Sequence, residues 1–152
     1  MKVSREGVAF VAGWEEFRSC PCWDSIGHTW TIGYGETQNI GPNTPCWTER
    51  HARRRLRKRL NRDYARPAWR LVKPQLRRCE RDALASFTYN VGIGNFTGST
   101  LLRRLNGSEG ASYATRKRVY REELIRWTNG GLAGLVKRRA AEVRMATKGD
   151  YS

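Results

Sequence analysis

Residues 15–35 read EEFRSCPCWDSIGHTWTIGYG, and this stretch decides how the rest of the chain is organised. Between Trp30 and Tyr34, aromatic and β-branched residues favour extended backbone, and glycines before and after them favour tight turns. The stretch from Trp23 to Pro45 is therefore predicted to form a small hairpin or a three-stranded ribbon. Asp24 is expected to open this β segment.

Helical patterns flank the β segment on both sides. Ser4 can cap a first helix whose apolar residues recur at helical spacing and which ends at or near Glu15. Thr48 is expected to cap a second, arginine-rich helix that Pro67 ends or bends. Further helices are expected over residues 79–91, 99–106, 111–127 and 132–148. Residues 1–152 are thus predicted to form one α+β domain, mainly helical, with a small β-containing N-terminal lobe, a helical C-terminal lobe and an inter-lobe cleft.

The chain is strongly basic, with 29 Lys and Arg against 14 Asp and Glu and a net charge of +15 in 152 residues. Such a surface concentrates near polyanions, among which nucleic acids and bacterial envelopes are both candidates. In the arginine-rich segment, Ala52, Leu56 and Leu60 fall on one helical face, with basic residues around the rest. This segment is either a solvated helix face or a surface that binds a polyanion. A helix that disrupts membranes is a further alternative, although its apolar face is narrow.

The four cysteines do not form a metal-binding pattern. Cys20 and Cys22 are separated by one residue, which is less than a structural zinc site uses, and neither histidine completes a ligand set. No metal is therefore expected. A bridge from Cys20 or Cys22 to Cys46 is possible, but free thiols are the preferred expectation for a protein made in a reducing compartment.

Two carboxyl groups near the first turn of the β segment are candidates for acid–base chemistry. Glu15 lies beside aromatic residues, where desolvation favours the protonated form, whereas Asp24 lies in a wetter turn and can stay ionised. Glycoside hydrolysis requires two carboxyl groups in different environments, because one protonates the leaving oxygen while the other activates water or stabilises a cation. The spacing alone is a weak indication, since most such pairs are surface charges.

Several segments, in order along nearly the whole chain, resemble the phage-type lysozymes, the endolysins of glycoside hydrolase family 24. They are residues 15–18 (EEFR), 24–27 (DSIG), 30–35 (WTIGYG), 82–92 (DALASFTYNVG), 99–106 (STLLRRLN), Trp127 and 134–142 (GLVKRRAAE). The resemblance implies a lysozyme-like fold and a muramidase that hydrolyses the β-1,4 bond between N-acetylmuramic acid and N-acetylglucosamine in peptidoglycan. It implies no metal and no organic cofactor.

The resemblance also implies roles for individual residues. Glu15, rather than Glu16, matches the catalytic acid because eight residues separate it from Asp24. Thr31 matches the threonine that helps to place the attacking water, although an extra residue before it must be absorbed by a bulge or longer turn and makes Thr29 a rival. The family typically inverts the anomeric centre.

Three further residues are expected to bind substrate or support the site. Arg138 falls where the family has an arginine that can pair with the catalytic glutamate. Tyr34 can stack on a sugar or pack in the core, and Asn90 can bind an N-acetyl group or cap a helix. Glu36 stands where the family often has histidine, so a supporting hydrogen bond is expected to differ.

The expected partner is bacterial peptidoglycan, and the protein is expected to be a monomer. No secretory signal and no membrane span are recognised, because the apolar stretch from Val8 to Trp14 is short and flanked by charges. The protein is therefore expected to stay in the host bacterial cytoplasm until a holin-type lesion releases it to the wall and the cell lyses. Two other functions are alternatives: a lytic transglycosylase, which would not need Asp24 and Thr31, and a nucleic-acid-binding module, for which no specific recognition motif is visible.

Overall fold

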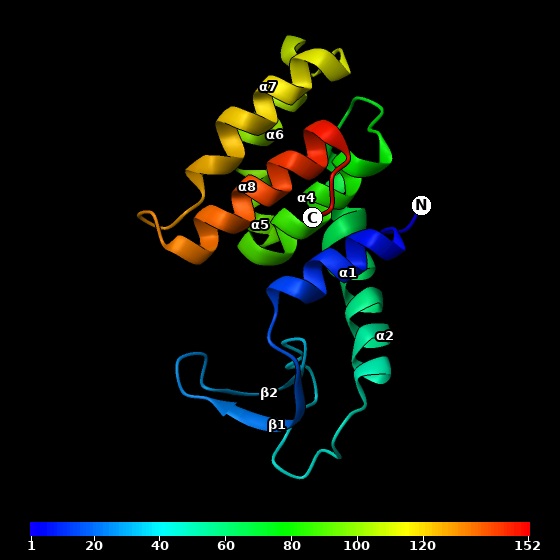
Figure 1. Ribbon diagram of the computed structural model, residues 1–152, viewed down its shortest axis with the longest axis vertical. Coiled ribbons are helices and arrows are strands. Elements are labelled where there is room, and N and C mark those ends of the chain that lie inside the picture. Colours follow the sequence, from blue (N-terminus) through cyan, green and yellow to red (C-terminus); the bar gives the residue numbers. More distant parts are fainter.

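A long helical rod connects a small β hairpin to a larger group of packed helices (Figure 1). The computed structural model describes all residues from Met1 to Ser152. The α-helices are α1 (Arg5–Trp14), α2 (Glu49–Arg59), α3 (Arg66–Leu71), α4 (Arg78–Val91), α5 (Ile93–Thr97), α6 (Thr100–Leu105), α7 (Tyr113–Glu123) and α8 (Ala133–Lys148). The strands are β1 (Arg18–Asp24) and β2 (Thr29–Gly33), and three short turns complete the order: π-helical η1 (Leu60–Ala65) and 3-10 helices η2 (Ser108–Gly110) and η3 (Leu124–Arg126).

The helix starts predicted from capping residues are confirmed. The hydroxyl of Ser4 accepts the Gly7 N–H at 2.9 Å, and Thr48 and Ser99 cap α2 and α6 in the same way. At the C-terminal end of α4, Gly92 adopts a φ of 86°, a positive value that favours glycine. These signals are local, which is why the sequence reveals them.

The hairpin has two strands and begins earlier than expected. Strand β1 starts at Arg18 rather than Trp23, and Asp24 is its last residue rather than the opening of the β segment. Asp24 pairs with Thr29 and Cys22 with Thr31, whereas Arg18 pairs with Gly33, so β1 contains a bulge between Arg18 and Cys22. No third strand forms, although an isolated bridge joins Ile32 to Glu36.

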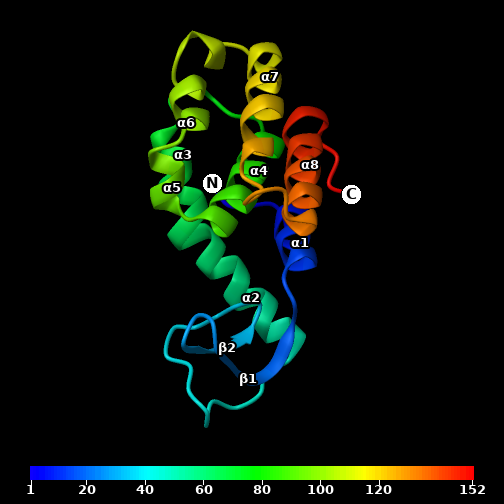
Figure 2. The same ribbon diagram turned by 90° about the vertical axis from the view of Figure 1, so that its left-hand side faces the viewer.

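The rod between the lobes is a single run of helix from Glu49 to Leu71. Pro67 does not end it, and the proline follows the π-helical turn η1 at the second residue of α3. The π-helical turn η1 widens the helix just before the proline. Figure 2 shows the rod running from the hairpin up to the other helices.

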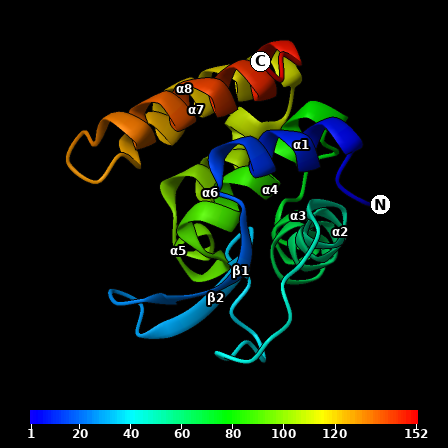
Figure 3. The same ribbon diagram turned by 60° about the horizontal axis from the view of Figure 1, so that its bottom comes forward.

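The hydrophobic core lies in the helical lobe around α4. The α4 residues from Ala83 to Thr88 are all buried, and α8 packs along α4. Figure 3 shows α7 and α8 side by side, with α1 beside them and the hairpin on the far side of the core. Trp127 is partly buried and packs edge-on against Phe87. None of the helices is long and apolar enough to cross a lipid bilayer.

The expectation of free thiols is wrong for two of the four cysteines. Cys20 on β1 forms a disulfide with Cys46 in the loop that precedes α2, whereas Cys22 and Cys79 remain free. The bulge in β1 and the course of the loop before α2 bring these two sulfurs together. No local sequence pattern predicts either feature. The disulfide ties the hairpin to the start of the rod.

Candidate active site

Glu15 lies where the helical lobe meets the hairpin. It is the C-cap of α1, and its backbone has left the helix with a ψ of 140°. The side chain is 26% exposed, and its Oε1 accepts a hydrogen bond from Nη1 of Arg138 at 2.9 Å. The pairing that the family resemblance implied for Arg138 is therefore present. It joins the end of α1 to α8, across 123 residues of sequence.

Behind Arg138 lies a buried cluster of charges. Glu142, one turn further along α8, is fully buried, and its Oε1 accepts hydrogen bonds from Ser86 Oγ at 2.6 Å and from Arg138 Nε at 3.4 Å. Its Oε2 lies 3.1 Å from Nε of Arg139, as an ion pair without hydrogen-bond geometry. Burial raises the pKa of Glu142, and the two guanidinium groups oppose that effect. The cluster therefore balances the cations Arg138 and Arg139 with the anions Glu15 and Glu142.

Asp24 projects from the end of β1 at the tip of the hairpin. Its Oδ1 accepts the N–H of Ile26 at 3.0 Å, an arrangement that holds the carboxylate against the turn. Gly27 permits this close packing, because a Cβ at that position would lie 2.7 Å from Asp24 Oδ2. The turn therefore fixes the position of the carboxylate through Oδ1, while Oδ2 accepts no hydrogen bond from the protein.

Thr31 lies on β2 opposite Cys22, and its hydroxyl donates to the Cys22 carbonyl oxygen at 3.4 Å. A cavity of about 440 Å³ brings Glu15, Asp24 and Thr31 together. Thr29, the rival for the role of Thr31, does not line it. The other lining residues are Glu16, Arg18, Trp23, Ser25, Ile26 and Gly35.

Tyr34 and Asn90 do not line this cavity. Tyr34 is 6% exposed, its hydroxyl donates to Glu49 at 2.9 Å, and its carbonyl oxygen accepts the hydroxyl of Tyr89 at 2.7 Å. Burial raises the pKa of Tyr89 to about 12, so this hydroxyl stays a donor at neutral pH. Asn90 is exposed at the end of α4, and its Oδ1 accepts a hydrogen bond from Arg139 at 2.7 Å. Both residues therefore make hydrogen bonds within the protein outside the cavity.

Sequence reasoning did not single out two residues that the structure adds to the site. Glu142 supports Arg138, and its position four residues along the same helix was the available signal. Trp23 lines the cavity, is 51% exposed and stacks edge-on against Trp30. Its cross-strand pairing with Trp30 depends on the register of the hairpin, which the sequence leaves open.

Glu36 makes the different supporting contacts that its identity led us to expect. It is 7% exposed, its Oε1 accepts the backbone N–H groups of Thr37 and Gln38, and its Oε2 lies 3.4 Å from Arg55 Nη2. This ion pair connects the loop after β2 to α2.

Comparison with known proteins identifies the family. The model of the family described as "Phage lysozyme" matches residues 12–142. This chain belongs to the phage lysozyme family. Like other phage lysozymes, it is a glycoside hydrolase that cleaves bacterial peptidoglycan.

Individual relatives support this assignment. An endolysin of Acyrthosiphon pisum secondary endosymbiont phage 1 is 29% identical over 145 residues, which cover 93% of this chain and 95% of the relative. A SAR-endolysin of Bacteriophage PS119 is 37% identical over 136 residues, covering 86% of this chain and 74% of the relative. Among solved structures, the muramidase domain of SpmX from Asticaccaulis excentricus superposes with a TM-score of 0.80 at 32% identity, covering 95% of this chain and 97% of that one. The lysozyme-like fold is thereby confirmed for this phage lysozyme.

Proposed function

We propose that Glu15 is the general acid of an inverting muramidase, and that Asp24 and Thr31 hold the water that attacks the anomeric carbon. The observation that carries the proposal is the common cavity. It joins the carboxyl group at the end of α1 to the carboxylate and hydroxyl of the hairpin. The substrate is the β-1,4 bond between N-acetylmuramic acid and N-acetylglucosamine.

The reaction needs a proton on the leaving oxygen and a nucleophile on the opposite face of the sugar. Glu15 Oε2 makes no hydrogen bond within the protein, whereas Oε1 is held by Arg138, so Oε2 is the oxygen that can deliver the proton. Asp24 can accept a proton from a water molecule, and the Thr31 hydroxyl can orient that water. The product is then a reducing sugar with inverted configuration at the anomeric carbon.

Arg138 acts through Glu15 rather than on the substrate, because its side chain is 5% exposed. Its contacts with Glu142 and with the Ser86 carbonyl oxygen limit its movement. A guanidinium held in this way restricts the rotamers of Glu15, which keeps the proton donor directed at the cavity. Positioning of this kind contributes to catalysis because small displacements of a reacting group are costly.

Substitution of the neighbouring glutamates tests the assignment. We expect Glu15→Gln to fold normally and to lose at least ~10²-fold in activity on peptidoglycan, because a general acid contributes roughly 10²–10⁴-fold. Glu16→Gln is the matched control, since Glu16 lines the same cavity but pairs only with exposed Arg18. Clearing of a peptidoglycan suspension measures activity. An inactive Glu16→Gln beside an active Glu15→Gln would refute the assignment.

The water-positioning role is tested on the hairpin. Asp24→Asn and Thr31→Ala should both impair turnover, while Thr29→Ala should leave it nearly unchanged, because Thr29 does not line the cavity. Mass spectrometry of the fragments separates the enzyme classes. Hydrolysis leaves reducing ends, whereas anhydro-muramyl ends would indicate a lytic transglycosylase and remove the need for the water.

The monomeric state and holin-dependent release from the bacterial cytoplasm also belong to the proposal. Sedimentation of the purified protein tests the first. Expression in bacteria with and without a co-expressed holin tests the second, and rapid lysis in the absence of the holin would contradict it.

A further inference from the structure

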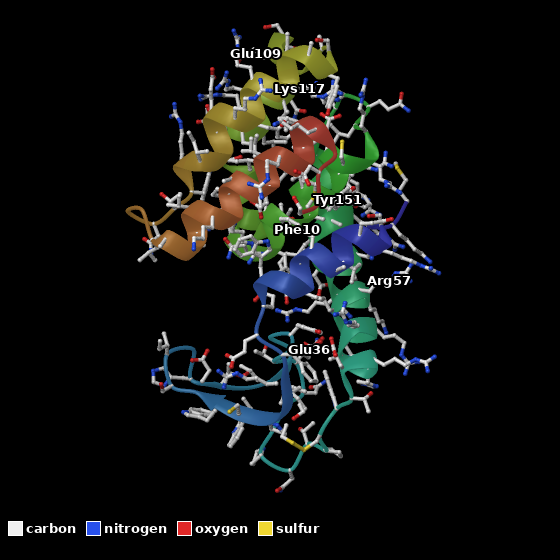
Figure 4. All side chains as sticks on the ribbon, in the orientation of Figure 1. Phe10, Glu36, Arg57, Glu109, Lys117 and Tyr151 are labelled. Atoms are coloured by element: carbon white, nitrogen blue, oxygen red, sulfur yellow. A yellow bond between two sulfur atoms is a disulfide. The ribbon has the colours of Figure 1, made fainter.

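A strip of basic side chains runs along the outer side of the rod, away from the active-site cavity. Two adjoining hollows, of about 600 and 560 Å³, lie along α2 and continue past η1, and both are lined by Arg54 and Arg57. We define the basic groove by six cations of these hollows, Arg5, Arg50, Arg54, Arg57, Lys58 and Arg66; Lys2, Arg53, Arg62 and the acidic Glu49 also line them. Figure 4 shows Arg57 and other basic side chains projecting from α2 on the side away from the hairpin. The groove shares no residue with the active-site cavity.

The cations of the basic groove are not used by the fold. All six are exposed, and none forms an ion pair with a carboxylate. Two other cations that line the same hollows behave differently, since Arg53 pairs with Glu49 and Arg62 with Asp63. Glu49 is the only carboxylate that lines either hollow, and Arg53 and Tyr34 already hold it, so the six like charges repel one another and destabilise the folded state. An anionic ligand would remove that cost.

The spacing of these cations suits a linear ligand. Arg50, Arg54 and Lys58 follow one another at four-residue intervals, which places their Cβ atoms about 5–6 Å apart. From Arg50 to Arg66 the strip extends about 24 Å at the helical rise of 1.5 Å per residue. A small anion would contact only part of such a strip, whereas a polymer with one negative charge per repeat would contact it along its length.

The side chains of the basic groove are suited to phosphate as the charged group. Five of the six are arginines, whose planar guanidinium groups bind phosphate oxygens in a bidentate manner. No aromatic residue lines either hollow, so the groove offers no surface for stacking nucleobases, which single-stranded nucleic acid sites use. The expected ligand therefore has a phosphodiester backbone without bases.

We propose that the basic groove binds a linear phosphodiester polymer attached to the bacterial cell wall, and so holds the enzyme on its insoluble substrate. This inference rests on the proposed function, because hydrolysis of peptidoglycan places the protein beside such polymers. The catalytic cavity then cleaves glycan while the rod remains on the polymer. Binding and cleavage occupy separate surfaces and can be measured separately.

The test measures binding of the inactive Glu15→Gln protein to purified Gram-positive walls, before and after hydrofluoric acid extraction of their phosphodiester polymers. The groove variant adds Arg54→Gln, Arg57→Gln, Lys58→Gln and Arg66→Gln. The matched control variant instead adds Arg103→Gln, Lys117→Gln, Arg121→Gln and Lys148→Gln, which remove the same charge from α6, α7 and α8. These positions make no ion pairs, and Lys117 lies at the opposite end of the molecule from the hairpin (Figure 4). Thermal unfolding confirms that both variants fold, and Arg54→Gln with Arg57→Gln alone is the second groove variant.

We expect intact walls to bind the parent and the control variant at least tenfold more tightly than they bind the groove variant. Extraction should abolish this difference. The slope of log K against log salt concentration should flatten by about 3 in the groove variant. Each of the four lost phosphate contacts contributes roughly 0.7 to the slope, the value that holds for single-stranded nucleic acids. Equal losses in both variants would overturn the proposal in favour of overall charge. If the parent bound extracted walls as tightly as intact walls, phosphate would be refuted as the ligand. If the parent bound oligo(dT) more tightly than the released polymer, nucleic acid would be favoured. Because Glu15→Gln is used throughout, residual wall cleavage would refute the catalytic assignment without affecting the binding result.

Discussion

Glu142 provides a direct test of the charge balance behind the catalytic glutamate. Its carboxylate is fully buried and touches Ser86, Arg138 and Arg139. Glu142→Gln keeps the shape of the side chain and removes only its charge. Two guanidinium groups would then share one remaining anion, Glu15, which is itself 26% exposed.

The expected loss follows from that imbalance. Removing one partner of a buried ion pair costs about 3–5 kcal/mol, because it leaves a buried charge uncompensated. The lower end of this range applies to Glu142→Gln, because Arg138 would still bond to Glu15 and Arg139 would still donate to Asn90 Oδ1. A loss of about 3 kcal/mol corresponds to a fall in Tm of roughly 6–12 °C for a chain of this size.

Urea unfolding and calorimetry at neutral pH measure the effect. Glu16→Gln is the control, because its ion pair with Arg18 is exposed and such pairs contribute at most about 1 kcal/mol. Replacing both Arg139 by Met and Glu142 by Leu should restore much of the lost stability, since an apolar pair needs no counter-charge. A loss below about 1 kcal/mol for Glu142→Gln would refute the reasoning. It would show that burial keeps this carboxyl neutral in the folded protein.

Two further predictions concern stability. Reduction of the Cys20–Cys46 disulfide, which closes a loop of 26 residues, should lower the free energy of unfolding by about 3.5 kcal/mol in the chain-entropy model. Cys46→Ser should show the same loss without reductant, Cys22→Ser should not, and identical unfolding curves with and without reductant would contradict the expectation. Hydrogen bonds from Arg104 and then Arg118 lower the pKa of Glu109 from 4.5 to about 2, so its stabilising effect is present above pH 4.5 and is lost as the pH falls towards 2. Acid unfolding should therefore be less steep between pH 4.5 and 2 in Glu109→Gln, and an unchanged pH dependence would count against this role.

The sequence by itself determined the features that depend on neighbouring residues. Helix starts at Ser4, Thr48 and Ser99 could be predicted because a capping side chain bonds to an N–H only a few residues away. Glu15, Asp24 and Thr31 could be named because they stand in short motifs that resemble those of a known family. The excess of basic residues, and with it the preference for an anionic partner, is also a property of composition alone.

Only the tertiary structure decided which distant groups meet. The fold placed Asp24 at the last position of β1 and joined Cys20, rather than Cys22, to Cys46. Packing of α8 against α4 buried Glu142 behind Arg138, in contact with Ser86, which lies 56 residues earlier.

The arginines of the rod show the same division. In the sequence Arg54 and Arg55 are indistinguishable neighbours, but the rod turns Arg55 towards the carboxylate of Glu36 and leaves Arg54 unpaired in the basic groove. A charge becomes part of the fold or remains free for a ligand according to which carboxylates the chain brings within reach. That depends on how the loop after β2 returns to α2, and contacts of this range are not encoded in any local pattern.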